Sequence, residues 1–201
     1  MDPTINSAVF CGTMASAPEF SHDNHGRRFF RFTLEVPRLS GVSDLLPILA
    51  AEDVLHQAEI NGGGALRVTG QLRSFNSREG LRRRLVLSVF ASQIENCDED
   101  PGNEVCLTGT ICRAPVFRRT PLGREICDLM LAVNRPYNRA DYLPCIAWGR
   151  TAAELSALPV GSVIHLTGRL QSREYIKQLE TGREQRTAYE ISALTACAVD
   201  L

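Results

Sequence analysis

The sequence is short of lysine and tryptophan, and it has no long apolar run. Lys177 is the single lysine among 22 basic residues, and the others are arginines, whose planar guanidinium pairs with phosphate and stacks on flat rings. GC-rich coding would raise arginine over lysine in the same way, so both explanations stay open. No apolar segment approaches the length of a membrane span, and the start, MDPTINSAVF, has neither the basic residues nor the apolar core of a signal peptide. We therefore expect a cytoplasmic protein.

Motifs of common catalytic and metal sites are also missing. The sequence contains no GxSxG, no P-loop and no GxGxxG motif, and its seven cysteines include no CxxC pair. The four histidines show no metal-ligand spacing, and His22 and His25 fall in a polar segment that predicts a turn. We expect reduced thiols, no metal or other cofactor, and no enzymatic activity.

Size and charge fit a globular protein with one large domain or two small ones. The chain has 201 residues, of which 44% are hydrophobic and 22% are charged, and its formal net charge is −1. This balance argues against a strongly basic nucleic-acid binder. The charge is uneven, because residues 101–201 carry 12 basic and 10 acidic side chains, whereas residues 1–100 carry 10 and 13. The second half is therefore the more basic one.

The only tryptophan closes a short apolar run, DYLPCIAWGR, at residues 141–150. Alternation predicts a buried strand in which positions 143, 145 and 147 face a core, while positions 142, 146 and 148 face the other way. A lone tryptophan is more often a core residue than a platform for a ligand. Arg150, two positions after Trp148, favours the second reading because it can pair with phosphate or stack on a base.

Self-comparison indicates one module written twice. Short blocks recur 97 positions apart, among them Gly12-Thr13 with Gly109-Thr110, Ala17-Pro18 with Ala114-Pro115, and Leu46-Pro47 with Leu143-Pro144. The displacement rises to 98 for Val68-Thr69-Gly70 and Leu166-Thr167-Gly168, and to 102 for Val89 and Ile191, which places the insertion in the last hairpin. We infer two tandem copies of one fold of about 95 residues.

Each copy is predicted to be mostly strand. In the second copy, apolar alternation predicts strands at 105–111, 127–133, 141–148, from 164 onward and at 186–196, with a short helix at 151–158. Three strands, a helix and two strands is the order of a five-stranded barrel of the oligonucleotide-binding (OB) type. Gly109 and Gly168 suit the sharp bends where a small barrel closes. We predict an all-β fold with a short helix per repeat, made of two tandem five-stranded OB-fold barrels.

The boundaries follow from an acidic segment with a Pro-Gly turn, ENCDEDPGN, at residues 95–103. We expect residues 1–95 to form the first and more divergent OB domain, residues 96–103 to form a linker, and residues 104–201 to form the second OB domain.

The second copy resembles bacterial single-stranded DNA-binding proteins over residues 103–197. The resemblance depends on ordered blocks: Gly109-Thr-Ile, Arg113-Ala-Pro115, Phe117-Arg-Arg-Thr120, Leu131-Ala-Val-Asn-Arg135, the strand at 141–150, Gly168-Arg-Leu-Gln-Ser172 and Ala188-Tyr-Glu-Ile191. It implies sequence-independent binding of single-stranded DNA in replication, recombination or repair, in association with the nucleoid. It also implies assemblies of four barrels, and two barrels per chain then imply a homodimer.

The resemblance further implies aromatic platforms along a basic groove, where each stacked base contributes about 1–3 kcal/mol. Trp148 matches a base-stacking tryptophan, and Tyr175 stands in a hairpin where the family often has another aromatic. Phe117 is either a platform or a plug, and Tyr189 is either a platform or a core residue. The phosphate contacts would come from nine cations: Arg113, Arg118, Arg119, Arg135, Arg150, Arg169, Arg173, Lys177 and Arg186.

The first copy departs from the family pattern, because Ala51 and Asp53 stand where the second copy has Trp148 and Arg150. Its aromatic residues include Phe29, Phe30, Phe32 and Phe75, and Arg82, Arg83 and Arg84 open its fifth strand. We expect the first barrel to bind weakly or to support assembly. The chain also stops at TACAVDL without the acidic tail typical of the family, so recruitment of replication partners through a tail is not expected.

Two other functions stay open at this point. The barrel also serves as a docking scaffold, so a primosome-type or other protein-interaction module with weak nucleic-acid binding is one alternative. Single-stranded RNA binding is another, because aromatic stacking alone does not distinguish RNA from DNA.

Overall fold

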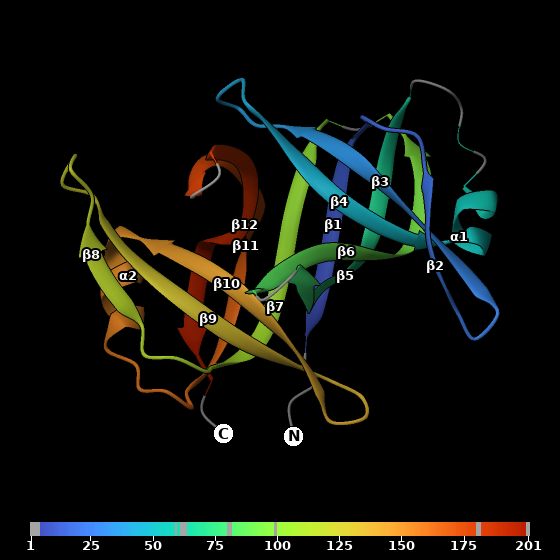
Figure 1. The fold of residues 1–201 in the computed structure, drawn as a ribbon. Coiled ribbons are helices and arrows are strands. Elements are labelled where there is room, and N and C mark those ends of the chain that lie inside the picture. Colours follow the sequence, from blue (N-terminus) through green and yellow to red (C-terminus); the bar gives the residue numbers. More distant parts are fainter. Residues whose placement is uncertain are drawn as a thin grey trace.

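The computed structural model describes residues 5–58, 60, 64–79, 82–98, 100–179 and 182–199. Within these ranges, the side chains at positions 78, 79, 82, 83, 177 and 179 lie outside the description. The described residues form two barrels side by side, with β7 between them in Figure 1. Neither of the two helices in these ranges is long and apolar enough to cross a membrane.

The first barrel is a closed ring of five strands. These are β1 (Asn6–Met14), β3 (Arg27–Pro37), β4 (Ser43–Ala51), β5 (Ala65–Glu79) and β6 (Arg82–Cys97). They pair in the order β1-β3-β4-β6-β5-β1, in which β4 and β6 are parallel and the other pairs are antiparallel. Helix α1 (Glu52–Gln57) follows the third strand of the ring, and β2 (Glu19–Asn24) forms a hairpin with β3.

The second barrel repeats this arrangement. Its strands are β7 (Gly102–Ile111), β9 (Glu125–Arg135), β10 (Arg139–Trp148), β11 (Val163–Leu179) and β12 (Gly182–Ala198), and they close in the order β7-β9-β10-β12-β11-β7. Helix α2 (Gly149–Ser156) again follows the third strand, and β8 (Val116–Arg119) pairs with β9. The predicted tandem OB fold is confirmed. The helix begins and ends two residues earlier than predicted, and neither β2 nor β8 was predicted.

Apolar alternation determines which side of each strand faces the core. In β10, Leu143, Cys145 and Ala147 are buried and Trp148 is exposed, as predicted. Ile146 is an exception: it was expected on the outer side, yet only 5% of it is exposed. Ile146 is paired with β9 on one side and with β12 on the other, so residues of both strands cover it, whereas Trp148 lies at the end of β10.

Glycine allows each barrel to close. A Cβ added at Gly168 would collide with the carbonyl oxygen of Ser192, and one added at Gly70 would collide with that of Phe90. Both glycines lie at register shifts between the fourth and fifth strands of their barrels. Since the paired backbone occupies the space of a side chain, these positions require glycine.

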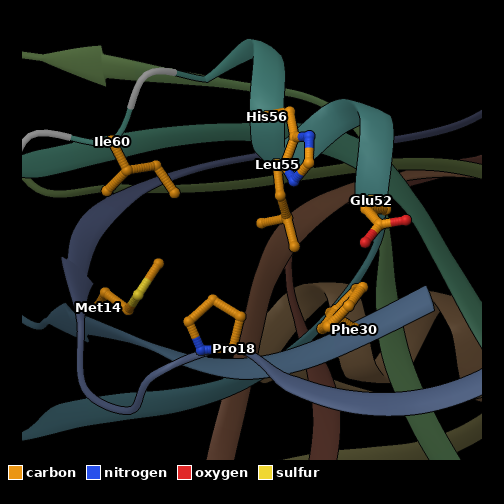
Figure 2. A pocket seen from close by; sticks show the side chains of 7 residues that line it. All are labelled: Met14, Pro18, Phe30, Glu52, Leu55, His56 and Ile60. Atoms are coloured by element: carbon orange, nitrogen blue, oxygen red, sulfur yellow. The ribbon is translucent and has the colours of Figure 1, made fainter. Parts of the chain in front are cut away.

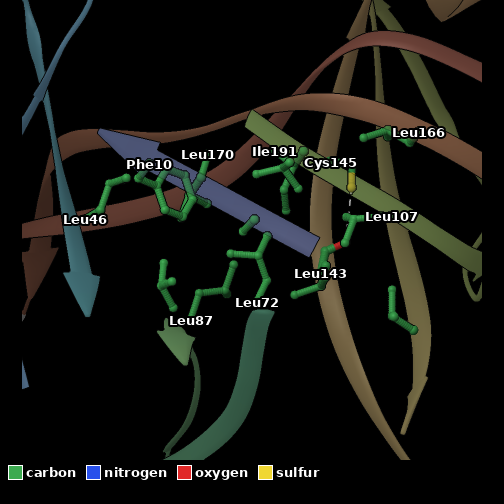
Figure 3. Close-up of a cluster of buried hydrophobic side chains, with 14 of the residues drawn as sticks. Phe10, Leu46, Leu72, Leu87, Leu107, Leu143, Cys145, Leu166, Leu170 and Ile191 are labelled. Carbon is green, nitrogen blue, oxygen red and sulfur yellow. Dashed lines mark hydrogen bonds between the residues drawn. The ribbon is translucent and has the colours of Figure 1, made fainter. Parts of the chain in front are cut away.

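The two barrels share one sheet and one core. Strand β1 pairs antiparallel with β7 from Asn6 opposite Leu107 to Cys11 opposite Gly102, so one sheet runs through both barrels. A single cluster of buried apolar side chains includes residues of both, such as Phe10 and Leu72 of the first and Leu107 and Ile191 of the second (Figure 3). The contact between the barrels is therefore built like a domain interior.

The predicted linker at 96–103 overlaps both of the strands that flank it. β6 runs to Cys97 and β7 begins at Gly102. The connection between strands is thus shorter than the acidic segment that predicted it, and the division of the chain into domains stays a prediction.

Candidate nucleic-acid interface

Trp148 lies at the rim of the second barrel, where β10 ends and α2 begins. Its relative exposure is 39%, and its indole Nε1 donates a hydrogen bond to Ser192 Oγ in β12 at 3.2 Å. The hydrogen bond holds one edge of the ring while part of the ring stays accessible. This geometry differs from that of a core tryptophan.

The hairpin of β11 and β12 presents five of the twelve predicted site residues on the same side as Ser192. Successive side chains of a strand alternate between faces, and directly opposed residues share a face. In β11, positions 169, 171, 173, 175 and 177 therefore lie on one face, opposite positions 192, 190, 188, 186 and 184 of β12. Arg169, Arg173, Tyr175 and Arg186 follow one another along this face, with Lys177 at the next position of β11, although its side chain is outside the described residues.

Strand β8 adds one more cation to this surface. Arg118 is opposite Ile126 of β9, and Ile126 is opposite Trp148 of β10, so the three residues form one row. We call the surface formed by Trp148, Ser192, Arg118, Arg169, Arg173, Tyr175 and Arg186 the Trp148 face.

Acidic residues neutralise part of the charge on the Trp148 face. Arg118 Nε lies 2.6 Å from Asp128 Oδ2, and this hydrogen bond raises the pKa of Arg118. Arg186 lies 2.6 Å from Glu184 Oε2 and is mostly buried. Arg169 and Arg173 are exposed, and Tyr175 has a relative exposure of 38%. The face thus combines two aromatic side chains with cations that are partly paired.

Five predicted residues lie apart from this face. Phe117 and Arg119 are exposed on the opposite side of β8, and Arg119 is paired with Glu125 at 2.7 Å. Arg113 is exposed in the turn after β7. Arg150 projects from the start of α2 and pairs with Glu154 at 2.7 Å, which raises its pKa.

Arg135, the fifth, lies at the contact between the barrels. Its Nε is 3.2 Å from Asp141 Oδ2, and that carboxylate is fully buried. The sequence does not distinguish such an arginine from a phosphate ligand, because its ion partner lies six positions further along the chain and is reached only through the β9–β10 hairpin.

Two further residues bear on this surface. Tyr142 lies on the same side of β10 as Trp148 and is exposed, and alternation along the strand was the signal for its position. Ser192 was not predicted, because its role depends on a side chain from another strand. Tyr189 is half-buried, and this burial raises the pKa of its hydroxyl.

The corresponding rim of the first barrel lacks both the indole and the guanidinium, because Ala51 and Asp53 stand in place of Trp148 and Arg150. Ala51 is buried, and Asp53 pairs with Arg27 at 2.9 Å, which lowers the pKa of Asp53. Phe29 and Phe32 are buried, whereas Phe75 is exposed on the β5–β6 hairpin.

A pocket of about 420 Å³ opens in the first barrel between α1 and the strands below it (Figure 2). Leu55 of α1 and Phe30 of β3 point into it, and Met14, Pro18 and Ile60 complete its apolar lining. Its two titratable side chains are Glu52, which pairs with Arg28 at 2.7 Å, and His56. Across the described ranges, no three His, Cys, Asp or Glu side chains form a group that could hold a metal ion.

The chain is similar in sequence to a known protein family and to several known proteins. The model of the single-strand binding protein family matches residues 102–197. A single-stranded DNA-binding protein of Oceanobacillus iheyensis is 33% identical over 94 residues, which cover 43% of this chain and 55% of that protein. A single-stranded DNA-binding protein of Deinococcus radiodurans is 26% identical over 230 residues, covering 96% of this chain and 76% of the relative. The chain spans about half the length of several curated relatives that it matches.

Solved structures extend the likeness to both barrels. The wild-type single-stranded DNA binding protein from Thermus aquaticus has a TM-score of 0.79 at 22% identity, covering 98% of this chain and 94% of that one. A deletion mutant of the same protein has a TM-score of 0.80 and covers this chain completely. At this identity the likeness shows that the tandem fold is shared. Residues 102–197 of the chain thus match the single-strand binding protein family.

Proposed function

We propose that this protein binds single-stranded DNA without sequence preference, and that the Trp148 face of the second barrel is the principal site. The observation that carries the proposal is the position of Trp148: its ring is accessible, is held by Ser192, and shares a face with Tyr175, Arg169 and Arg173. A flexible single strand offers flat bases and a charged backbone, and this face offers stacking surfaces and cations to match.

The proposal includes a division of labour between the domains at residues 1–95 and 104–201. Binding at the rim of the first barrel is expected to be weaker, because Ala51 and the Asp53–Arg27 pair replace an indole and an exposed arginine. We assign Arg113, Arg119, Arg150 and Phe117 to the outskirts of the site, where a longer strand would reach them.

Four barrels per assembly would require a homodimer of this chain, and we propose that state, with a role in DNA replication, recombination or repair. Exposed strand edges such as β8 offer a surface for pairing. No catalytic step is assigned, and the place of action proposed is the cytoplasm, on nucleoid DNA.

Titration of the full chain with oligo(dT), with the fluorescence of the single tryptophan as the signal, tests the proposal. Stacking at Trp148 should quench the fluorescence, and the affinity should fall as salt rises, because phosphate contacts release counterions. A parallel titration with oligo(U) distinguishes DNA from RNA preference. Absence of quenching and of binding to either polymer would contradict the proposal and favour the protein-interaction module.

A further inference from the structure

The first barrel carries its aromatic bulk on a different strand from the second. Ala51 ends β4 where Trp148 ends β10, and Phe90 of β6 has the register position that Ser192 has in β12. In the second barrel a large ring from the third strand contacts a serine of the fifth. In the first barrel Phe90 of the fifth strand is opposite Leu49 of the third, and the third strand ends at Ala51 without a ring. Both barrels thus have a large aromatic ring near this rim, but it comes from the third strand in the second barrel and from the fifth strand in the first.

Phe90 belongs to a column of ring contacts that ends at the surface. Its ring centroid lies 5.9 Å from that of Phe29, with an interplanar angle of 41°. His22 of β2 stacks on Phe29 at 5.0 Å and 11°. The guanidinium of Arg73 lies 5.9 Å from the centre of the Phe90 ring, and that of Arg27 lies 5.7 Å from the centre of Phe29. We call these five residues the first-barrel column.

The open end of the column is His22. Phe29 is only 5% exposed and Phe90 is half-buried. Arg73 is mostly buried and donates to Asp141 and Gln71, so it closes the inner end. His22 is exposed, and its ring is nearly parallel to Phe29 beneath it. A flat ligand approaching the column therefore meets the imidazole of His22 first.

We propose that a base of single-stranded DNA stacks on the imidazole of His22, which gives the first barrel a base platform of its own on β2. The inference depends on the proposed function of the chain. Stacking tolerates any base, because every base has a flat face. Arg27 supplies a cation beside the platform for a neighbouring phosphate, with its charge shared with Asp53. The platform rests on a buried ring, so it is held in place before a ligand arrives.

Phe20 provides a matched control on the same strand. It is exposed and aromatic, but it packs against Phe30 at 5.9 Å, whereas His22 packs against Phe29. Adjacent residues of β3 point to opposite faces, so Phe20 and His22 lie on opposite sides of the sheet.

The test uses the full chain and a fluorescently labelled oligo(dT), with fluorescence polarisation at fixed salt. His22→Ala should weaken binding by about fivefold or more, as expected for one lost stacking contact. His22→Phe should restore binding, because it keeps a flat ring on Phe29. Phe20→Ala should bind as the parent does, and combining His22→Ala with Trp148→Ala should multiply the two losses. Circular dichroism melting of each variant checks the fold.

The outcomes separate this inference from the function on which it depends. If Trp148→Ala weakens binding and His22→Ala does not, the platform on β2 is refuted and the proposed function stands. If neither variant changes binding, both are refuted. Equal losses in His22→Ala and Phe20→Ala, or a failure of His22→Phe to restore binding, would refute a stacking role for His22.

Discussion

Ser74, in the first barrel, donates its backbone N–H to Oδ1 of Asp141 in the second barrel at 2.7 Å. The contact is made twice, because Ser172 of the second barrel donates to Asp44 of the first at 2.7 Å as well. The hydroxyl of each serine also accepts the backbone N–H of the residue that follows the aspartate, Tyr142 for Ser74 and Leu45 for Ser172. The β5–β6 hairpin is thus hydrogen-bonded to β10, and the β11–β12 hairpin to β4, in a nearly twofold arrangement.

The buried carboxylate of Asp141 should be important for stability. Arg73 and Arg135 both pair with it, at 3.1 and 3.2 Å, so its loss leaves two arginines without their anion. We expect Asp141→Ala to lower the free energy of unfolding by about 3–5 kcal/mol, the range for breaking a buried ion pair. Urea denaturation measures it. The control is Glu154→Ala, which removes an exposed pair with Arg150 and should cost less than about 1 kcal/mol. Similar losses in both variants would contradict this role of the buried Asp141 carboxylate.

Gly168→Ala should destabilise the second barrel. The added Cβ would strike the carbonyl oxygen of Ser192, which cannot move without breaking the pairing of β11 and β12. A loss of about 1–3 kcal/mol in the free energy of unfolding is expected from such overpacking. Gly102→Ala is the comparison, because its Cβ would meet Cys11 at an ordinary 3.6 Å. An unchanged melting temperature for Gly168→Ala would show that the barrel closure relaxes.

Trp148→Ala should weaken oligo(dT) binding by about 1–3 kcal/mol, because one stacking surface is lost. The ring is at the rim, so the far-ultraviolet circular dichroism and the melting temperature should change little. Fluorescence polarisation of a labelled oligonucleotide measures the affinity. Val160→Ala removes an exposed apolar side chain in the loop after α2 and should bind as the parent does. A collapse of the fold in Trp148→Ala would mean that the indole is a core element.

Arg169 is an exposed cation of the Trp148 face and should contribute to the salt dependence of binding. In Arg169→Ala, the slope of log K against log salt should become shallower by about 0.7, the value for one phosphate contact with a single strand. Arg31→Ala is a suitable control, because Arg31 lies in the first barrel and pairs with Glu19 at 3.5 Å. An unchanged slope in Arg169→Ala places this arginine away from the backbone of the DNA.

Burial raises the pKa of the Cys145 thiol above its ordinary value of 9.0. The folded chain therefore keeps the proton at pH values where the unfolded chain loses it. The stability that this thiol contributes is complete below about pH 9 and is lost as the pH rises above that value. The free energy of unfolding, measured from about pH 8 to about pH 10.5, should fall more steeply in the parent than in Cys145→Val. Parallel curves for the two proteins would contradict a buried, protonated thiol.

Local pattern was enough to predict the tandem barrels. Alternation of apolar residues determines which side of a strand faces the core, and the 97-residue repeat shows that the same strand pattern occurs twice. Trp148 at a strand end, with Arg169, Arg173 and Tyr175 on one face of β11, follows from the same periodicity. The burial of Ile146 does not, because it depends on which strands flank β10.

The sequence by itself determined the two folds, their order and the alternation that places Arg169, Arg173 and Tyr175 on one face, because alternation depends on neighbours close along the chain. Only the tertiary structure decided that Arg135 and Arg73 both pair with Asp141, that β1 joins β7, and that His22, Phe29 and Phe90 form one column. These contacts depend on how the strands and hairpins fold against one another, and an arginine or an aromatic residue carries no local sign of which partner it will meet.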